Sequence, residues 1–341
     1  MAVTGRTASI GALARLGAVP VWVALAASAI PFAVGLEVPP RLRYLPFLAS
    51  LVIFGLPHGA ADHLAVARLK GRRPHLAVGA AYLVGGAAYL AVWAVAPALA
   101  FAGFILLTWY HWGQGDLYFL LALGGEHLRT RGQRLLALAV RGGIPMLVPL
   151  VAFPEVYRSV ARATVSLFDP AVADAFAPAF HPPVRLGVGA ALAALSVGSL
   201  ALGYVRARAT ARGWSGWRTD AVETALLWAY FLVVPPVLAI GLYFCLWHSV
   251  RHVARLLAVN DGRSLRRARD VAPALVAFGR DALPNTVGAL ALLGGLAVVA
   301  PPTTELRSLL GLYLVLLAVL TLPHTAVVTW MDWREGVWSV A

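Results

Sequence analysis

The sequence has few charged residues: Asp, Glu, Lys and Arg make up only 13% of its 341 residues, while hydrophobic residues make up 60%. A soluble globular domain carries about a quarter charged residues, so this chain is too apolar to hide its surface in water. It also lacks the alternating pattern of half-buried strands. Apolar runs of about 20 residues recur from end to end. We therefore predict an all-α, polytopic integral membrane helical bundle.

Cysteine is nearly absent as well. The single Cys245 excludes an intrachain disulfide and a cysteine-based metal cage, and its apolar surroundings predict a small buried side chain. We detect no linker and no internal repeat, so we predict one transmembrane domain over residues 1–341. Arg6 and Arg15 precede an apolar run that is longer than a signal-peptide core, and a second run follows closely. This start predicts a first spanning helix rather than a signal peptide.

The apolar runs predict ten spans, or nine if the short seventh, which ends at Pro235-Pro236, is a re-entrant or broken helix. The expected spans are 17–36, 44–66, 75–96, 98–122, 134–153, 183–204, 220–234, 236–257, 282–300 and 307–330. The segment 154–182 mixes Arg158, Arg162, Asp169 and Asp174 with apolar residues. It is typical of an amphipathic segment along the outer membrane interface.

Positive charge gathers in alternate loops. The net charge of +13 would suggest nucleic acid in a soluble protein, but here the arginines lie between apolar runs. The basic loops are 67–73 (Arg68, Lys70, Arg72, Arg73), 124–134 (Arg129, Arg131, Arg134), 205–219 (Arg206, Arg208, Arg212, Arg218) and 258–281 (Arg263, Arg266, Arg267, Arg269, Arg280). The positive-inside rule places these loops and both termini in the cytoplasm. We predict a multi-pass protein of the cell membrane, with the lipid bilayer and not nucleic acid as its partner.

Histidines occur inside the predicted spans, where ionisable groups usually mark function. Six of them lie on four spans that share one direction, at a similar depth in the middle or the cytoplasmic half: His58, His63, His111, His248, His252 and His324. The alternative for a single such histidine is a hydrogen bond between helices. Six at one depth favour a metal or proton-handling site. His75, His127 and His181 fall in loops or at span ends, where we expect solvated side chains.

The pair His248 and His252 has the sharpest spacing. Residues four apart project from one face of a helix, so two imidazoles can bind one metal. A hydrogen-bonded pair near a basic helix end is the alternative. Arg251 and Arg255 follow the same end, and we expect them to extend to the cytoplasmic surface.

Three stretches combine a histidine with a glycine or proline and an aspartate: PHGAAD, YHWGQGD and LPHTAVVTWMD. Pro57 predicts a kink beside His58, and the glycines permit a close backbone approach. Asp62 and Asp116 are candidates to accept the second N–H of a ligating histidine, which would fix its orientation. Structural hydrogen bonds are their alternative role.

An all-imidazole site suits zinc, copper, iron or nickel, and the HExxH pattern of zinc hydrolases is absent. Aromatic residues surround the histidine motifs, either as packing, as an interfacial belt or as the lining of a site for a flat apolar substrate. The candidates near the site are Trp109, Tyr110, Trp112, Tyr243 and Trp247. Other readings are a haem protein, another membrane iron oxygenase, and a transporter or proton channel that uses intramembrane His and Asp.

Four blocks together resemble a known family. FGLPHGAADH, WYHWGQGD, LWHSVRHVAR and LPHTAVVTWMD are similar, in the same order, to the signature blocks of the Brp/Blh family of membrane-bound β-carotene 15,15'-dioxygenases. The resemblance covers residues from about 50 to 335. The family often has leucine at the position of Ala61 and phenylalanine at that of Trp112.

This resemblance implies cleavage of the central double bond of β-carotene by O2, which gives two all-trans-retinal molecules. It implies an Fe(II) cofactor held by His58, His111, His248 and His252, with His63 and His324 as neighbouring or pocket residues. A microbial rhodopsin that receives the retinal is the partner that it suggests.

Overall fold

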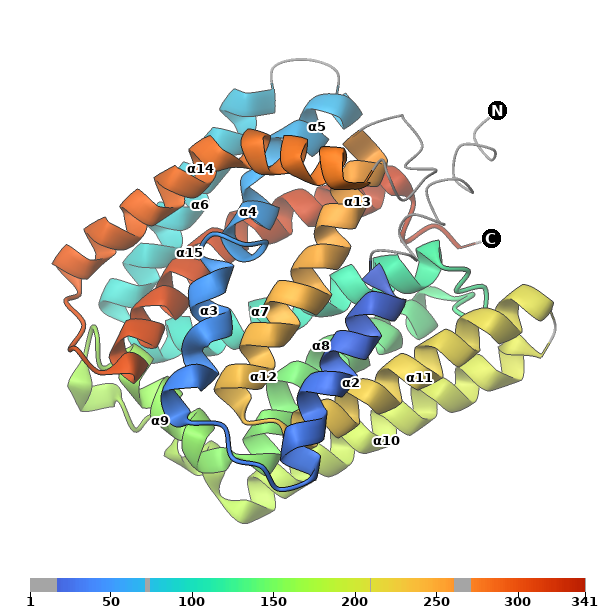
Figure 1. The fold of residues 1–341 in the computed structure, drawn as a ribbon, viewed down its shortest axis with the longest axis horizontal. Coiled ribbons are helices and arrows are strands. Elements are labelled where there is room, and N and C mark those ends of the chain that lie inside the picture. Colours follow the sequence, from blue (N-terminus) through green and yellow to red (C-terminus); the bar gives the residue numbers. More distant parts are fainter. Residues whose placement is uncertain (1–16, 71–73, 209, 261–270, 341) are drawn as a thin grey trace.

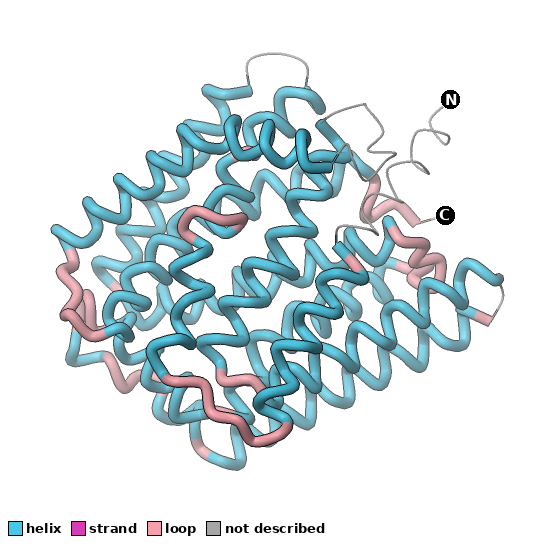
Figure 2. The backbone as a smooth tube through the Cα atoms, viewed as in Figure 1, coloured by secondary structure: helices cyan, strands magenta, loops and turns pink. Residues whose placement is uncertain are grey.

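The computed structural model describes residues 17–70, 74–208, 210–260 and 271–340, and every regular element in this part is helical (Figures 1 and 2). The all-α prediction is therefore confirmed for the described chain. The longer α-helices are α2 (Val19–Ala33), α6 (Pro74–Val95), α7 (Pro97–Ala122), α8 (Arg131–Ala152), α9 (Pro154–Val165), α10 (Pro182–Ala207), α11 (Ala211–Val233), α13 (Val250–Asn260), α14 (Val271–Val299) and α15 (Leu306–Glu335). The shorter elements are η1 (Pro40–Tyr44), α3 (Leu45–Ser50), α4 (Gly55–Ala60), α5 (Asp62–Lys70), η2 (Pro170–Val172), η3 (Ala177–Phe180), α12 (Pro236–Leu242) and the π-helix η4 (Tyr243–Ser249).

Local sequence signals set many helix ends. Several helices begin on a proline, which supplies a helical φ where no N–H partner is needed. Thr130 and Gln133 form a reciprocal capping box at the start of α8. Gly336, with φ 74°, ends α15 in the left-handed conformation that glycine adopts without strain.

Helical segments lie at all ten predicted spans, but the count of ten membrane crossings is not confirmed. Seven segments are long and apolar enough to cross a membrane: Pro40–Ala67, Leu76–Val95, Arg131–Ala152, Pro182–Ala207, Pro236–Leu257, Val271–Val299 and Leu306–Glu335. Helix α2 has only 15 residues. Helices α7 and α11 are long enough, but polar residues interrupt their apolar sequence. The seventh predicted span is longer than expected, because α11 continues unbroken from Ala211 to Val233.

The second span is broken, as the Pro-His-Gly turn predicts, although the break precedes Pro57. Helix α3 ends at Ser50, and Phe54 has a φ of 58°, a left-handed conformation that is costly for a bulky residue. At Gly55 a Cβ atom would lie 2.2 Å from the carbonyl oxygen of Ser50, so only glycine fits there. Pro57 lies in the first turn of α4, where its missing N–H costs no hydrogen bond.

Two close backbone contacts hold α7 against α8. A Cβ atom on Gly113 would lie 2.1 Å from the carbonyl oxygen of Leu138, and one on Gly142 would lie 1.9 Å from that of Trp109. The predicted role of a glycine near His111 is thus confirmed.

Helix α7 lies between two apolar cores. One core joins α6, α9 and α15, and the other joins α8, α11 and η4.

The segment 154–182 folds as α9, η2 and η3 against α15, α7 and α8. Gly311 of α15 allows this contact, because a Cβ atom there would lie 3.0 Å from the backbone of Thr164. Arg158 and Arg162 each pair with Asp174 at 3.1 Å, and these side chains are exposed to a third or more.

Several charged residues used to predict the first span and the orientation lie outside the part that the structure describes. They are Arg6, Arg15, Arg72, Arg73, Arg263, Arg266, Arg267 and Arg269, and the side chains of Arg68, Lys70 and His75 lie outside it as well. His181 is exposed, as predicted. The prediction for His127 is wrong: it is fully buried, and its Nε2 lies 3.2 Å from the Asp220 carboxylate.

Candidate metal centre

Five of the six intramembrane histidines meet in one buried cluster. His58 comes from α4, His111 from α7, His248 from η4, His252 from α13 and His324 from α15, and each is at most 7% exposed. The ring centroid of His58 lies 5.0 to 5.4 Å from those of His248, His252 and His324. The ring of His111 lies 4.7 Å from that of His248 and 4.6 Å from that of His324. Helices far apart in sequence thus bring imidazoles to one point, as their predicted depth requires.

Oxygen acceptors face the Nδ1 atoms of three of these rings. The Nδ1 of His58 contacts the carbonyl oxygen of Gly55, that of His111 lies 3.4 Å from Gln114 Oε1, and that of His324 lies 2.7 Å from Asp62 Oδ2. An N–H at Nδ1 donates to each oxygen and leaves the Nε2 lone pair for a metal. Among the described residues, His324 Nε2 has no hydrogen-bond partner.

The nitrogen positions fit a metal ion. His58, His111 and His324 offer three ligand atoms within 4.8 Å of one another, and so do Asp62, His252 and His324. The Nε2 atoms of His111 and His248 lie 3.1 Å apart. Two imidazoles that bind one ion at about 2.0–2.1 Å place their nitrogens roughly 3 Å apart. Because His324 belongs to both groups, it lies inside the cluster and not merely beside it.

A π-helical turn presents His248. The segment Tyr243–Ser249 widens from an α-helix to a π-helix and returns to an α-helix at Val250. Such turns are frequent at functional sites because they redirect side chains locally. The rings of His248 and His252 remain nearly parallel, with centroids 6.5 Å apart. Both therefore reach the cluster from one helix, as the four-residue spacing predicts.

Asp62 links three side chains at the edge of the cluster. Its Oδ2 accepts from Tyr82 at 2.7 Å and faces His324 Nδ1 at the same distance, while its Oδ1 lies 3.8 Å from His252 Nε2. The sequence did not single out Tyr82, since a tyrosine in an apolar helix carries no signal of its own. The carboxylate orients His324, and the role of Asp62 as the partner of a ligating histidine stays a prediction.

Asp116 does not orient a histidine, so that prediction is wrong. Its Oδ1 accepts from Trp247 Nε1 at 2.8 Å and from Arg251 at 3.1 Å, and its Oδ2 lies 3.2 Å from Arg141. Glu223 pairs with both Arg141 and Arg251. The two carboxylates and two guanidiniums form a buried network, in which all four side chains are at most 2% exposed.

The predicted extension of Arg251 and Arg255 to the membrane surface is also wrong. Arg251 lies over the Trp247 ring, 3.7 Å from its centroid, inside the network with Glu223. Arg255 is 2% exposed and pairs with Asp332 at 2.7 Å. Each guanidinium pairs with buried carboxylates inside the bundle, which offsets part of the cost of removing it from water. Charged residues inside apolar runs, such as Arg141 and Glu223, were the sequence signal for this network.

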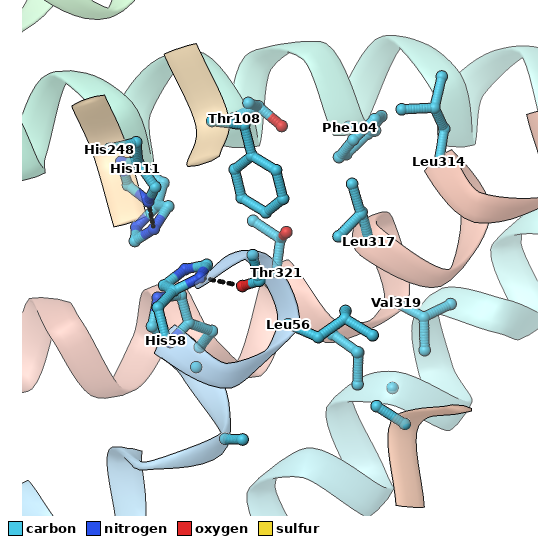
Figure 3. A pocket seen from close by; sticks show the side chains of 18 of the residues that line it. Leu56, His58, Phe104, Thr108, His111, His248, Leu314, Leu317, Val319 and Thr321 are labelled. Carbon is cyan, nitrogen blue, oxygen red and sulfur yellow. Dashed lines mark hydrogen bonds between the residues drawn. The ribbon is translucent and has the colours of Figure 1, made fainter. Parts of the chain in front are cut away.

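An apolar cavity of about 690 Å³ opens beside the cluster (Figure 3). His58, His111 and His248 lie at one end of the view, and Phe104, Leu314 and Val319 lie toward the other. The volume falls within the usual range for small-molecule sites, about 300–1,000 Å³. The cluster thus faces a space that suits a hydrophobic molecule.

Of the predicted aromatic residues, only Trp112 lines this cavity, and its ring lies 5.8 Å from that of His248. Trp109 donates to the Ala139 carbonyl, Tyr110 lies 3.4 Å from Thr329, and Tyr243 packs on Trp112. Trp247 belongs to the buried charge network. These four are packing residues around the site and not cavity walls.

His63 is the sixth intramembrane histidine, and it lies apart from the other five. It lines the cavity, but its Nδ1 lies 3.1 Å from the Ala60 carbonyl and 3.1 Å from the Asn285 amide nitrogen. Its predicted place as a pocket residue agrees with this position.

The fold and the site define a multi-pass helical membrane protein whose buried imidazole cluster fits a metal ion beside an apolar cavity. The chain belongs to the beta-carotene 15,15'-dioxygenase family, whose model matches residues 49–332, and it is an enzyme of that family. It is 51% identical to probable beta-carotene 15,15'-dioxygenase Blh of Halobacterium salinarum strain NRC-1, over 93% of this chain and 92% of the relative. It is 34% identical to probable beta-carotene 15,15'-dioxygenase Brp of strain R1, over 92% and 90%. No solved structure matches the chain.

Replacing Asp62 with asparagine is expected to weaken metal binding about 10- to 100-fold, the usual effect of removing an outer partner of a metal site. The neutral amide no longer stabilises the N–H of His324. Iron titration against a competing chelator measures the affinity. Asp220→Asn is the matched control, because Asp220 is a similarly buried partner of His127, which lies outside the cluster. Equal affinities in Asp62→Asn and the wild type would contradict the role assigned to Asp62.

Proposed function

We propose that this protein cleaves the central 15,15' double bond of β-carotene with O2 and produces two molecules of all-trans-retinal. The observation that carries the proposal is the cluster of five buried imidazoles, four of which line an apolar cavity, in a chain of this family. The reaction balances without another reactant. The C=C bond breaks, and each of its two carbons receives one oxygen atom of O2.

We propose Fe(II) as the cofactor, with His58, His111, His248 and His252 as its ligands. The acceptors at the Nδ1 atoms of His58 and His111 and the 3.1 Å separation of His111 and His248 support this set. His324 lies equally close and is held by Asp62, so its contribution is tested separately below. Iron held by neutral imidazoles supplies activation of O2 when it is bound.

The protein itself supplies an apolar binding site that excludes water. Apolar side chains such as Leu56, Phe104 and Leu317 line the cavity, so a hydrocarbon enters it without losing hydrogen bonds to water. The shape of the cavity selects which double bond lies against the imidazoles. We infer no general acid or base for this reaction, because no proton is gained or lost overall.

We also propose an orientation in the cell membrane. The basic loops and both termini lie in the cytoplasm by the positive-inside rule, and the segment 154–182 lies along the outer interface of a single transmembrane domain. A microbial rhodopsin is the proposed recipient of the retinal. These placements rest on charge and amphipathicity.

The test is expression of the chain in bacteria that produce β-carotene, followed by chromatography of retinal and residual carotene. We expect about two retinals for each carotene lost, as the proposed stoichiometry requires, and no loss without O2. Purified protein should contain iron and lack the Soret band of haem. A folded, iron-loaded protein that leaves carotene intact would falsify the proposed function, and vesicle transport of ions by metal-free protein would favour the transporter alternative.

A further inference from the structure

The cavity beside the cluster has two different ends. One end is closed by residues of α7, α9 and α15, among them Phe101, Tyr157 and Leu310. Helix α15 runs along the cavity from His324 in the cluster to Leu310 at the closed end. The length of helix between these two residues is about 21 Å, at a rise of 1.5 Å per residue. Phe101 and Leu310 are each 5% exposed, so the bundle seals the cavity here.

The other end reaches the outer surface of the bundle between α6 and α14. Leu83 of α6 lines the cavity and is 73% exposed, and Leu292 of α14 lines it and is 37% exposed. A side chain that both lines a cavity and faces the surroundings marks the point where the cavity opens. Since α6 and α14 are apolar helices long enough to cross a membrane, their surroundings are lipid.

Both helices rest on α15 without filling the space between them. Helix α6 packs on α5, α7 and α15, whereas α14 packs on α4 and α15 (Figure 1). Gly79 and Gly288 line the cavity, and among the described residues no atom comes within 4 Å of a Cβ added at either one. Gly86, by contrast, would place its Cβ 3.3 Å from Val319 of α15. Open space at the two glycines lies on the cavity side of α6 and α14.

We propose that this opening, the lateral portal formed by Gly79, Leu83, Gly288 and Leu292, admits the carotenoid to the cluster directly from the bilayer. The inference rests on the proposed function. None of the four side chains is polar, so a hydrocarbon crosses from lipid to cavity without meeting water or charge. The polar neighbour Asn285 turns to the Ala60 carbonyl, with its amide nitrogen 2.7 Å from that oxygen, and leaves the portal apolar.

The portal is tested by blocking it after the protein has folded. Gly288→Cys is purified, reconstituted in lipid nanodiscs that contain β-carotene, and assayed before and after modification with a bulky hydrophobic maleimide. Gly294→Cys is the matched control, because Gly294 is also on α14 and in open space but does not line the cavity. Wild-type protein treated with the same maleimide is a further control. It measures the effect of any reaction at the native Cys245, which is 7% exposed. Leu83→Cys and Val84→Cys repeat the comparison on α6, because Leu83 lines the cavity and Val84 does not.

We expect modification to slow retinal formation more than tenfold in Gly288→Cys and Leu83→Cys, with iron content unchanged, and to leave both controls unaffected. Mass spectrometry confirms complete modification. Full turnover in modified Gly288→Cys and Leu83→Cys would overturn the portal while the proposed function stands. An iron-loaded wild-type protein that cleaves no carotenoid would overturn the proposed function and the portal with it.

Discussion

His248→Ala is expected to lose iron and to lower retinal formation by more than about 100-fold, beyond the usual effect of an outer partner. The Nε2 of His248 lies 3.1 Å from that of His111, and the π-helical turn η4 holds the ring at this point. Alanine removes one proposed ligand from the cluster. Metal analysis of the purified protein and chromatography of retinal measure the two effects.

Companion substitutions separate ligands from neighbours. His252→Ala should also lose iron if His252 is a ligand, whereas His324→Ala should retain iron with reduced affinity. The reverse result would exchange the roles of these two residues. His181→Ala is the control, because His181 is exposed at the start of α10 and outside the cluster. Retained iron and activity in His248→Ala would show that the proposed ligand set is wrong.

Glu223→Gln is expected to reduce the free energy of unfolding by about 3–5 kcal/mol, the usual cost of breaking a buried ion pair. Glu223 pairs with both Arg141 and Arg251, and the three side chains are at most 2% exposed. A neutral amide leaves two guanidiniums with only Asp116 as a carboxylate partner, away from water. The thermal midpoint and the denaturant dependence of unfolding in detergent measure the change.

A surface ion pair provides the matched control for this prediction. Asp174 also pairs with two arginines, Arg158 and Arg162, but all three are exposed to a third or more, so Asp174→Asn should cost less than about 1 kcal/mol. The double variant Glu223→Gln/Arg141→Gln should be less destabilised than the sum of the single variants, because it removes the unpaired charge together with its partner. Equal effects of Glu223→Gln and Asp174→Asn would contradict a stabilising role for the buried network.

Much of the candidate site was predictable because its residues are costly in an apolar environment. Histidines in the spans are rare enough to indicate function, and five of the six lie in one cluster. The four-residue spacing of His248 and His252 correctly predicted that both rings reach the same cluster. The position of His324 inside the cluster could not be predicted from its motif, since its depth on α15 does not determine which way the ring points.

The partners of the charged residues were not predictable in the same way. Asp116 follows His111 closely in sequence and yet turns to Arg141, Arg251 and Trp247. Arg251 lies beside His252, near a basic helix end, where extension to the surface is the usual expectation. It stays buried because Glu223, on another helix, offers a carboxylate. Local sequence does not contain that information.

The sequence by itself determined that this chain forms apolar helices, where those helices lie and which polar residues they carry, because hydrophobic periodicity and proline or glycine signals act over a few residues. Only the tertiary structure decided which polar groups pair, that Asp62 rather than Asp116 serves the imidazoles, and that the cavity opens between α6 and α14. Pairing and openings depend on the rotation and packing of helices that are distant in sequence, which no local pattern encodes.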